Sequence, residues 1–119
     1  MDTKAVNLAV VSRYLDEIWN EGRVELIAET TANPLIRHSP GEVIEMSHES
    51  QMERIKKRIM ENRPHFSVDY AVVANEAVAI AWNGRHADGS ETGGIEIFKI
   101  VRGTITEVWN NGRLPGLWK

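Results

Sequence analysis

The chain has 119 residues, so we expect one domain over residues 1–119 that can bury a substantial core. Its formal net charge of −3 gives no electrostatic reason to expect nucleic acid or an anionic membrane as a partner. The absence of cysteine excludes disulfides, thiolate catalysis and cysteine-ligated zinc. Polar residues interrupt the N-terminal segment and no apolar run could span a bilayer, so we expect neither a secretory leader nor a membrane span, and a cytoplasmic location.

The first half of the sequence predicts three helices. Apolar residues at steps of three and four predict an amphipathic helix from about residue 3 to residue 20, capped by Asp2 or Thr3. A shorter helix is expected over residues 24–31, ended by Asn33-Pro34, and residues 35–41 follow as a short strand that runs into a turn. Ser47 is the expected cap of a third helix that reaches Asn62.

The third helix has a narrow apolar seam among many charged residues. Met52, Ile55 and Ile59 form the seam, and the basic run Lys56-Lys57-Arg58 lies beside it. Glutamates surround this run, so we interpret it as a solvated helix face rather than a nucleic-acid patch.

The second half predicts strands over about residues 66–72, 77–86, 92–101 and 104–110. In the first of these, Phe66, Val68, Tyr70 and Val72 alternate with polar residues and are expected on one buried face. A tight turn at Arg102-Gly103 joins the last two strands. Three helices followed by antiparallel hairpins predict an α+β fold, with the helices on the concave face of a strongly curved, mostly antiparallel sheet.

Glu96 is the most informative residue, because it is a carboxylate in a strand built mostly of Ile, Val and Phe. It shares strand parity with Phe98, so it lies on the inner wall if Phe98 packs under the helices. Enclosure would raise the pKa of Glu96 and make it a candidate acid or base. The alternative is an ion pair across the sheet with a cation such as Arg85, and the sequence leaves both open.

His86 shares a strand face with Trp82, Ile80 and Val78, which places an imidazole at the rim of an apolar wall. A neutral imidazole can shuttle protons, although a histidine satisfied near a loop is an equally good interpretation. The four histidines form no local chelating pair, so no metal site is expected.

The order of these elements resembles a known family. Its most specific segments are Tyr14–Asn20, Ile36-Arg37-His38-Ser39-Pro40, Gly84-Arg85-His86, and Ile97–Ile100 with Gly103–Trp109. Together they resemble the SnoaL-like branch of the nuclear transport factor 2-like superfamily, over nearly the whole chain. The resemblance implies a cone-shaped fold whose wide end holds an apolar pocket, in a superfamily of polyketide cyclases, ketosteroid isomerases, dehydratases and non-catalytic scaffolds.

The resemblance also implies candidate site residues. His38 falls near the general-base aspartate of ketosteroid isomerases, Tyr14 near their oxyanion-hole tyrosine, and Glu96 near their second, hydrogen-bond-donating acid. The catalytic aspartate of SnoaL-type cyclases would follow Trp109, but this chain has Asn110-Asn111-Gly112-Arg113, so that role is not carried over. For Tyr14, plain helix packing is the alternative.

We therefore expect an enzyme that works without metal or organic cofactor, with His38 and His86 as proton carriers, Glu96 as acid or orienting group, and Tyr14 polarising a carbonyl. The ligand is expected to be a hydrophobic carbonyl-containing small molecule, and the reaction isomerisation, cyclisation or water loss. A non-catalytic ligand-binding or dimerisation module is the alternative. The expected cavity wall comprises Trp19, Trp82, Phe98, Trp109 and Asn110.

A homodimer is expected through the outer face of the sheet. Ile95, Ile97 and Val101 lie on the face opposite Phe98, interrupted by Lys99. Three helices cannot cover both faces, and a twofold partner would hide the exposed apolar surface.

Overall fold

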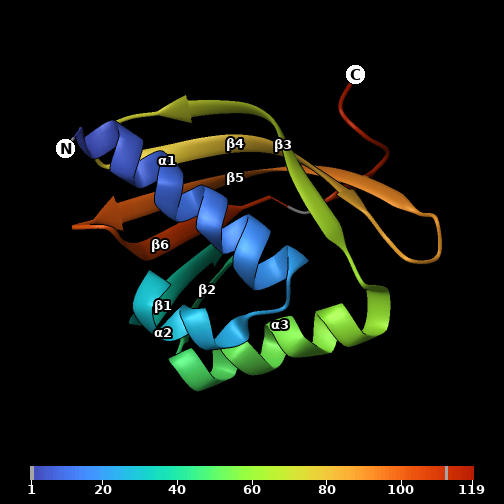
Figure 1. The fold of residues 1–119 in the computed structure, drawn as a ribbon, viewed down its shortest axis with the longest axis horizontal. Coiled ribbons are helices and arrows are strands. Elements are labelled where there is room, and N and C mark those ends of the chain that lie inside the picture. The colour runs from blue at the N-terminus through green and yellow to red at the C-terminus, as the bar shows by residue number, and fades with distance from the viewer. Residues whose placement is uncertain (1, 112) are drawn as a thin grey trace.

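The computed structural model describes residues 2–111 and 113–119, which form a seven-stranded mixed sheet and a set of helices; Met1 and Gly112 lie outside the described residues (Figure 1). The strand order is β2-β1-β6-β5-β4-β3, and β7 pairs with β5 beyond the end of β6. In chain order the elements are α1 (Thr3–Arg13), η1 (Tyr14–Asn20), η2 (Val24–Leu26), α2 (Ile27–Thr30), β1 (Thr31–Ser39), β2 (Glu42–Met46), α3 (His48–Asn62), β3 (His65–Val73), β4 (Ala77–Arg85), β5 (Glu91–Val101), β6 (Thr104–Asn110) and β7 (Leu114–Pro115).

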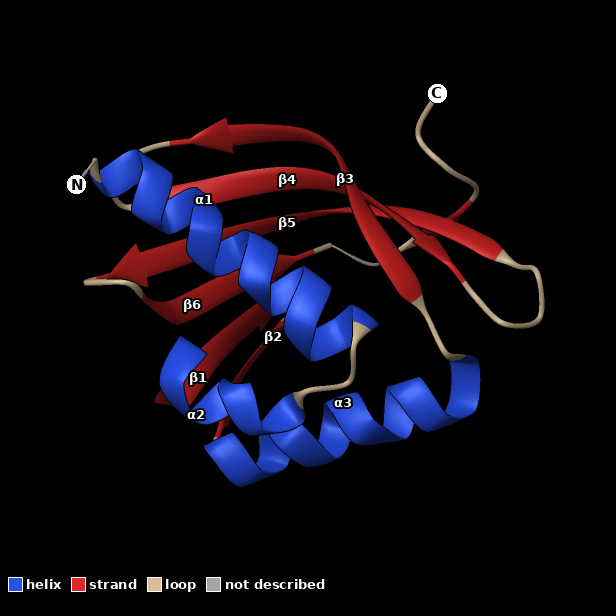
Figure 2. Cartoon of the chain, viewed as in Figure 1, coloured by secondary structure: helices blue, strands red, loops and turns tan. Residues whose placement is uncertain are grey.

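The sheet is mostly antiparallel, as predicted. The one parallel pair among the described strands joins β1 to β6, and β3, β4, β5 and β6 follow one another as hairpins. Figure 2 shows the sheet curving behind the helices, with α1 and α3 on the same side of it. The expectation of an α+β fold with a curved sheet is therefore confirmed.

The core lies between α1, η1 and the inner face of β4, β5 and β6. Ile18 and Phe98 are fully buried there, and Val11 and Leu15 of the predicted helical stripe also belong to this cluster. Burial of an aliphatic or aromatic side chain of this size contributes about 1.5–3 kcal/mol. Because Phe98 points inward, alternation along β5 places Glu96 on the inner face too.

The first helix begins as predicted but ends in a wider turn. Asp2 caps α1 by accepting a hydrogen bond from the Lys4 N–H, at 3.1 Å. From Tyr14 onward the helix is π-helical, and the Glu21 N–H donates to the Asp16 carbonyl five residues earlier, at 3.1 Å. Single π-helical turns of this kind are frequent at functional sites.

Strand β2, which was not predicted from the sequence, lies between the turn at Gly41 and the cap of α3. Ser47 accepts a hydrogen bond from the Ser50 N–H at 3.1 Å and caps α3, as predicted. Before it, the chain turns at Gly41, whose φ of +83° favours glycine, and returns as β2. Strand β2 was not predicted because it is short and mostly exposed, so no alternation of buried and polar residues marks it.

The predicted buried face of β3 is wrong beyond Phe66. The pairing of β3 with β4 shifts register between Val68 and Tyr70, which is a β-bulge. After the bulge the alternation changes phase, so Ala71 packs against the core and Tyr70 is 69% exposed. Val68 and Val72 are exposed as well, and Phe66 remains on the inner side.

Two asparagines tie the first helix to β3. The Asn20 side chain accepts from the Phe66 N–H and donates to the Phe66 carbonyl, both at 2.8 Å. The buried Asn7 side chain donates to the carbonyls of Ala74 and Asn75 in the turn after β3, both at 3.0 Å. These contacts fix the helix over the edge of the sheet. No helix among the described residues has the length and apolar character needed to cross a membrane.

Candidate active site

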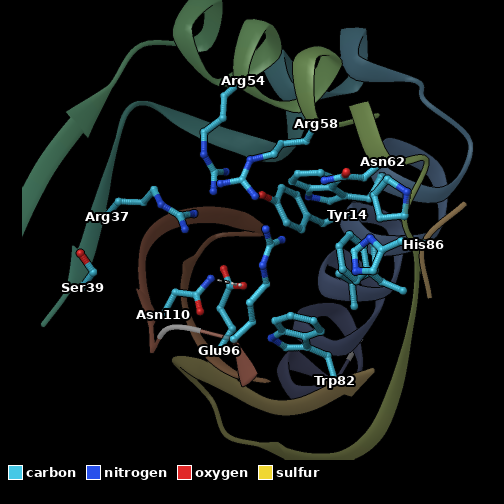
Figure 3. Close-up of a pocket in the computed structure, with 15 residues that line it drawn as sticks. Tyr14, Arg37, Ser39, Arg54, Arg58, Asn62, Trp82, His86, Glu96 and Asn110 are labelled. Carbon is cyan, nitrogen blue, oxygen red and sulfur yellow. Dashed lines mark hydrogen bonds between the residues drawn. The ribbon is translucent and has the colours of Figure 1, made fainter. Parts of the chain in front are cut away.

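A cavity of about 280 Å³ lies between η1, α3 and the inner face of the sheet. In Figure 3, Arg54 and Arg58 descend into it from α3, Arg37 enters from β1, and Glu96 and Trp82 face them from the sheet. Its volume is near the lower end of the range for small-molecule sites, which is about 300–1,000 Å³. The cavity therefore suits a small organic ligand.

Glu96 is the acidic group of the cavity. Its residue is 9% exposed, and the Asn110 side-chain Nδ2 donates to Oε1 at 3.3 Å. Burial raises the pKa of Glu96 from 4.5 to about 7, although the charges of Arg37 and Arg54 act in the opposite direction. Arg85, the alternative partner, pairs instead with Glu91. Near neutral pH the carboxyl group can therefore give or take a proton.

Tyr14 enters the cavity at the start of η1. Its ring packs edge-on against Phe98, with centroids 5.8 Å apart at an interplanar angle of 69°. Burial, and then the neighbouring charge of Glu96, raise the pKa of Tyr14 above its ordinary value. The phenol therefore keeps its proton and remains a hydrogen-bond donor across the physiological pH range.

Three aromatic rings form one wall. Phe66 meets Trp19 and Trp82 edge-on, with centroid separations of 5.4 and 5.3 Å. The Trp82 indole lies directly over Gly94 on β5, where an added Cβ would come within 2.6 Å of the indole Cε2. Trp82 is 7% exposed, and its Nε1 has no hydrogen-bond partner among the described residues. Glycine at position 94 is therefore what allows the indole to take this place.

His86 also lines the cavity, at the end of β4. Its Nε2 lies 3.1 Å from the Thr92 hydroxyl oxygen, and its buried Nδ1 has no partner in the described part of the chain. One ring nitrogen is thus held by the sheet, and the other is buried without a partner among the described residues.

His38 does not line this cavity, so the expectation that it carries protons in one site with His86 and Glu96 is wrong. His38 projects from the outer face, where Nε2 contacts a carboxylate oxygen of Glu107 and the ring stacks on Trp109 at 4.7 Å and 6°. Buried Leu35 fixes the phase of β1, so alternation brings Arg37, and not His38, to the inner face.

Two of the expected wall residues also lie elsewhere. Trp109 is 37% exposed on the outer face, while the next residue, Asn110, points into the cavity. Phe98 is fully buried beneath Tyr14 and supports the cavity without lining it. The structure therefore brings together Tyr14, Trp19, Trp82, His86, Glu96 and Asn110.

The arginines of the cavity were missed at the sequence level. Arg54 and Arg58 are one helical turn apart on α3, are only partly exposed and line the cavity, so this side of the basic segment is not a fully solvated helix face. The shared parity of Arg37 with Leu35 was the available signal for β1. Among the described residues, no three histidine, aspartate or glutamate side chains form a group able to hold a metal ion.

Neither a protein-family model nor a curated protein matches this sequence. Several solved structures do match its fold. A candidate ketosteroid isomerase from Kribbella flavida has a TM-score of 0.78 at 16% identity, covering 91% of this chain and 78% of that one. A candidate polyketide cyclase from Acidithiobacillus ferrooxidans has a TM-score of 0.78 at 18% identity, covering 92% and 89%.

A candidate SnoaL-like polyketide cyclase from Jannaschia has a TM-score of 0.75 at 16% identity, covering 92% of this chain and 87% of that chain. Identities this low show a shared fold and do not carry a substrate or a reaction with them. The chain therefore has the fold of the SnoaL-like and nuclear transport factor 2-like proteins.

Proposed function

We propose that this protein is a cofactor-independent acid–base enzyme that moves a proton next to the carbonyl group of a small hydrophobic molecule. The observation that carries the proposal is Glu96, a carboxyl group buried in an aromatic-walled cavity with a pKa raised to about 7. A catalytic acid or base works best when its pKa is near the operating pH. The structural neighbours named as candidate isomerases and cyclases support the reaction class.

In this proposal the Glu96 carboxylate removes a proton from the carbon beside the carbonyl. Tyr14, whose phenol stays protonated, donates a hydrogen bond to the carbonyl oxygen as negative charge develops on it. The protonated Glu96 then returns the proton to another carbon, which gives isomerisation, or the enolate closes a ring or expels a hydroxyl group. His86, whose ring also lines the cavity, serves as the second proton carrier.

Exchange of carbon-bound hydrogen for deuterium tests this proposal without knowledge of the natural substrate. Phenylacetone is a suitable first probe, because it joins an aromatic ring to an activated methylene beside a ketone. In D₂O, NMR should show protein-dependent loss of the methylene signal, and Glu96→Gln should abolish the protein-dependent part. Glu53→Gln, an exposed glutamate on α3, is the matched control. Equal exchange rates with Glu96→Gln and the unmodified protein would refute the role of Glu96, and binding without any exchange would favour a ligand-binding module.

We further propose that a second copy of the chain covers the outer face of the sheet. Ile95, Ile97 and Trp109 are exposed there, and the strand registers place Ile97 opposite Trp109 across β5 and β6. A group of exposed large apolar side chains on one sheet face is characteristic of a protein interface. Light scattering should give a mass of twice 13.4 kDa. Ile97→Asp should lower it to the monomer mass, whereas Met60→Asp, at an exposed position on α3, should not.

A further inference from the structure

Four arginines from separate parts of the chain meet in the cavity. Arg37 comes from β1, Arg54 and Arg58 from α3, and Arg113 from the segment before β7. In Figure 3 the side chains of Arg37, Arg54 and Arg58 converge on the space above Glu96. This gathering is notable because the chain as a whole has a formal net charge of −3.

These arginines have no acidic partner within salt-bridge distance among residues 2–111 and 113–119. Elsewhere three arginines of the chain are paired: Arg13 and Arg23 both contact Glu17, and Arg85 contacts Glu91. Glu96, the acid that shares the cavity, accepts its hydrogen bond from Asn110. The cavity therefore holds several positive charges and at most one negative charge.

Uncompensated positive charge of this kind is unfavourable until an anion arrives. Arg54 is partly buried, and this burial, together with the nearby charge of Arg37, lowers the pKa of Arg54. Enclosed cations with low-dielectric walls focus their field on the cavity and attract anions into it. A guanidinium also binds a carboxylate through two parallel hydrogen bonds, which gives orientation as well as affinity.

We propose that the ligand of this cavity is a small aromatic or similarly apolar organic acid, with its carboxylate held by Arg37 and Arg54 and its apolar body against Trp82 and Phe66. If the same molecule also carries the reacting carbonyl group, this inference rests on the proposed function. The carbonyl group then lies between Tyr14 and Glu96. The substrate class is accordingly a carbonyl compound that bears a carboxylate. The aromatic wall and the small volume favour such an acid over a phosphate ester.

A bound carboxylate would also change the chemistry of Glu96. Arg37 and Arg54 are the charges that lower the pKa of Glu96 in the empty cavity. A ligand carboxylate neutralises that influence and adds a negative charge nearby, so the pKa of Glu96 should rise on binding. Near pH 7 the complex should therefore take up part of a proton from solution, and the substrate itself would make its base stronger.

A pair of isosteric probes tests the charge requirement on the unmodified protein. Phenylacetate and phenylacetamide have nearly the same shape, and only the first carries a charge. Isothermal titration calorimetry should show phenylacetate binding at least about tenfold more tightly, the factor expected for charge-assisted hydrogen bonds to a buried partner. Equal affinities, or no binding of phenylacetate at millimolar concentration, would overturn the proposal. Inorganic phosphate that binds as tightly as phenylacetate would overturn the assignment to an organic acid.

Variants then locate the binding group. Arg54→Gln should weaken phenylacetate binding about tenfold or more and leave phenylacetamide unchanged. Lys56→Gln removes the same charge from an exposed position on α3 and should have no comparable effect. An equal loss in both variants would mean that general positive charge, and not the cavity, attracts the anion, and would overturn the proposal.

Proton uptake separates this inference from the proposed function. Titrations in buffers of different ionisation enthalpy should show proton uptake with phenylacetate near pH 7, and Glu96→Gln should lose this uptake while still binding the acid. An acid-specific site without hydrogen exchange on any ketone would contradict the catalytic proposal and support this one. Exchange on phenylacetone without tighter binding of phenylacetate than of phenylacetamide would support the catalytic proposal and contradict this inference.

Discussion

Glu96→Gln should make the protein more stable at alkaline pH. The folded protein holds the pKa of Glu96 at about 7, above its ordinary value of 4.5, because the carboxyl group is buried. Below about pH 4.5 both folded and unfolded chains carry the proton, and no penalty exists. Between pH 4.5 and 7 the unfolded chain releases it first, so stability falls as the pH rises, and above pH 7 the loss is complete.

The size of the effect follows from the same pKa difference. Each pKa unit corresponds to about 1.4 kcal/mol, so ionisation of Glu96 removes up to about 3 kcal/mol of unfolding free energy between pH 4 and pH 8. Glutamine keeps the shape and an oxygen that can accept from Asn110, and it never ionises. The variant should match the unmodified protein near pH 4 and exceed its stability by up to about 3 kcal/mol near pH 8.

Urea denaturation followed by tryptophan fluorescence at several pH values measures this difference. The quantity to compare is the difference in unfolding free energy between the two proteins at each pH, because all other groups titrate equally in both. Glu53→Gln, exposed on α3, should track the unmodified protein at every pH. A gap for Glu96→Gln that stays constant from pH 4 to pH 8 would refute the reasoning, since it would mean that Glu96 is as well solvated when folded as when unfolded.

Three further predictions concern the cavity wall and its supports. Gly94→Ala should lower the unfolding free energy by about 1–3 kcal/mol and change the fluorescence of the Trp82 indole above it. Adding Trp82→Phe should recover part of this loss, because the smaller ring leaves room for the new methyl group. Additive effects of the two substitutions in a double-mutant cycle would contradict this. Tyr14→Phe should lower kcat for hydrogen exchange about 10²-fold with little change in KM, whereas Tyr70→Phe, on the exposed part of β3, should change neither. Asn20→Ala should destabilise the protein by about 1–3 kcal/mol, because it leaves a strand N–H and carbonyl unpaired; a loss below 0.5 kcal/mol by thermal or urea unfolding would show that water replaces the side chain.

The sequence predicted the elements better than it predicted which residues share a face. Helical periodicity and the cap at Ser47 gave the α3 start correctly, and the parity of Glu96 with Phe98 gave the inner face. In two places an extra residue in a strand changes the alternation of inward and outward side chains. The β3 bulge turned Tyr70 outward, and a register shift between β5 and β6 allows both Ile105 and Val108 to be buried, although simple alternation puts them on opposite faces.

The charge of the site was harder to predict from the sequence than its position in the fold. By residue type and spacing, Arg54 and Arg58 resemble residues of a solvated helix face. Only the packing of α3 over the cavity shows that they line it. The choice between Arg37 and His38 depended on the phase of a strand whose early start at Thr31 was not predicted. A sequence pattern gives local periodicity, whereas the charge of a cavity depends on elements brought together from distant parts of the chain.

Trp109 and Asn110 follow one another in β6 and face opposite sides of a single sheet layer. One backbone therefore sets the geometry of two surfaces, the cavity wall and the exposed apolar face. A substitution at either position alters one surface, but deletion of Glu107 or Val108 would exchange the phases and turn the indole inward and the amide outward. Change by substitution can adjust the two surfaces separately, whereas change in the length of β6 disrupts both at once, so the length of this strand should be far less tolerant of variation than its side chains.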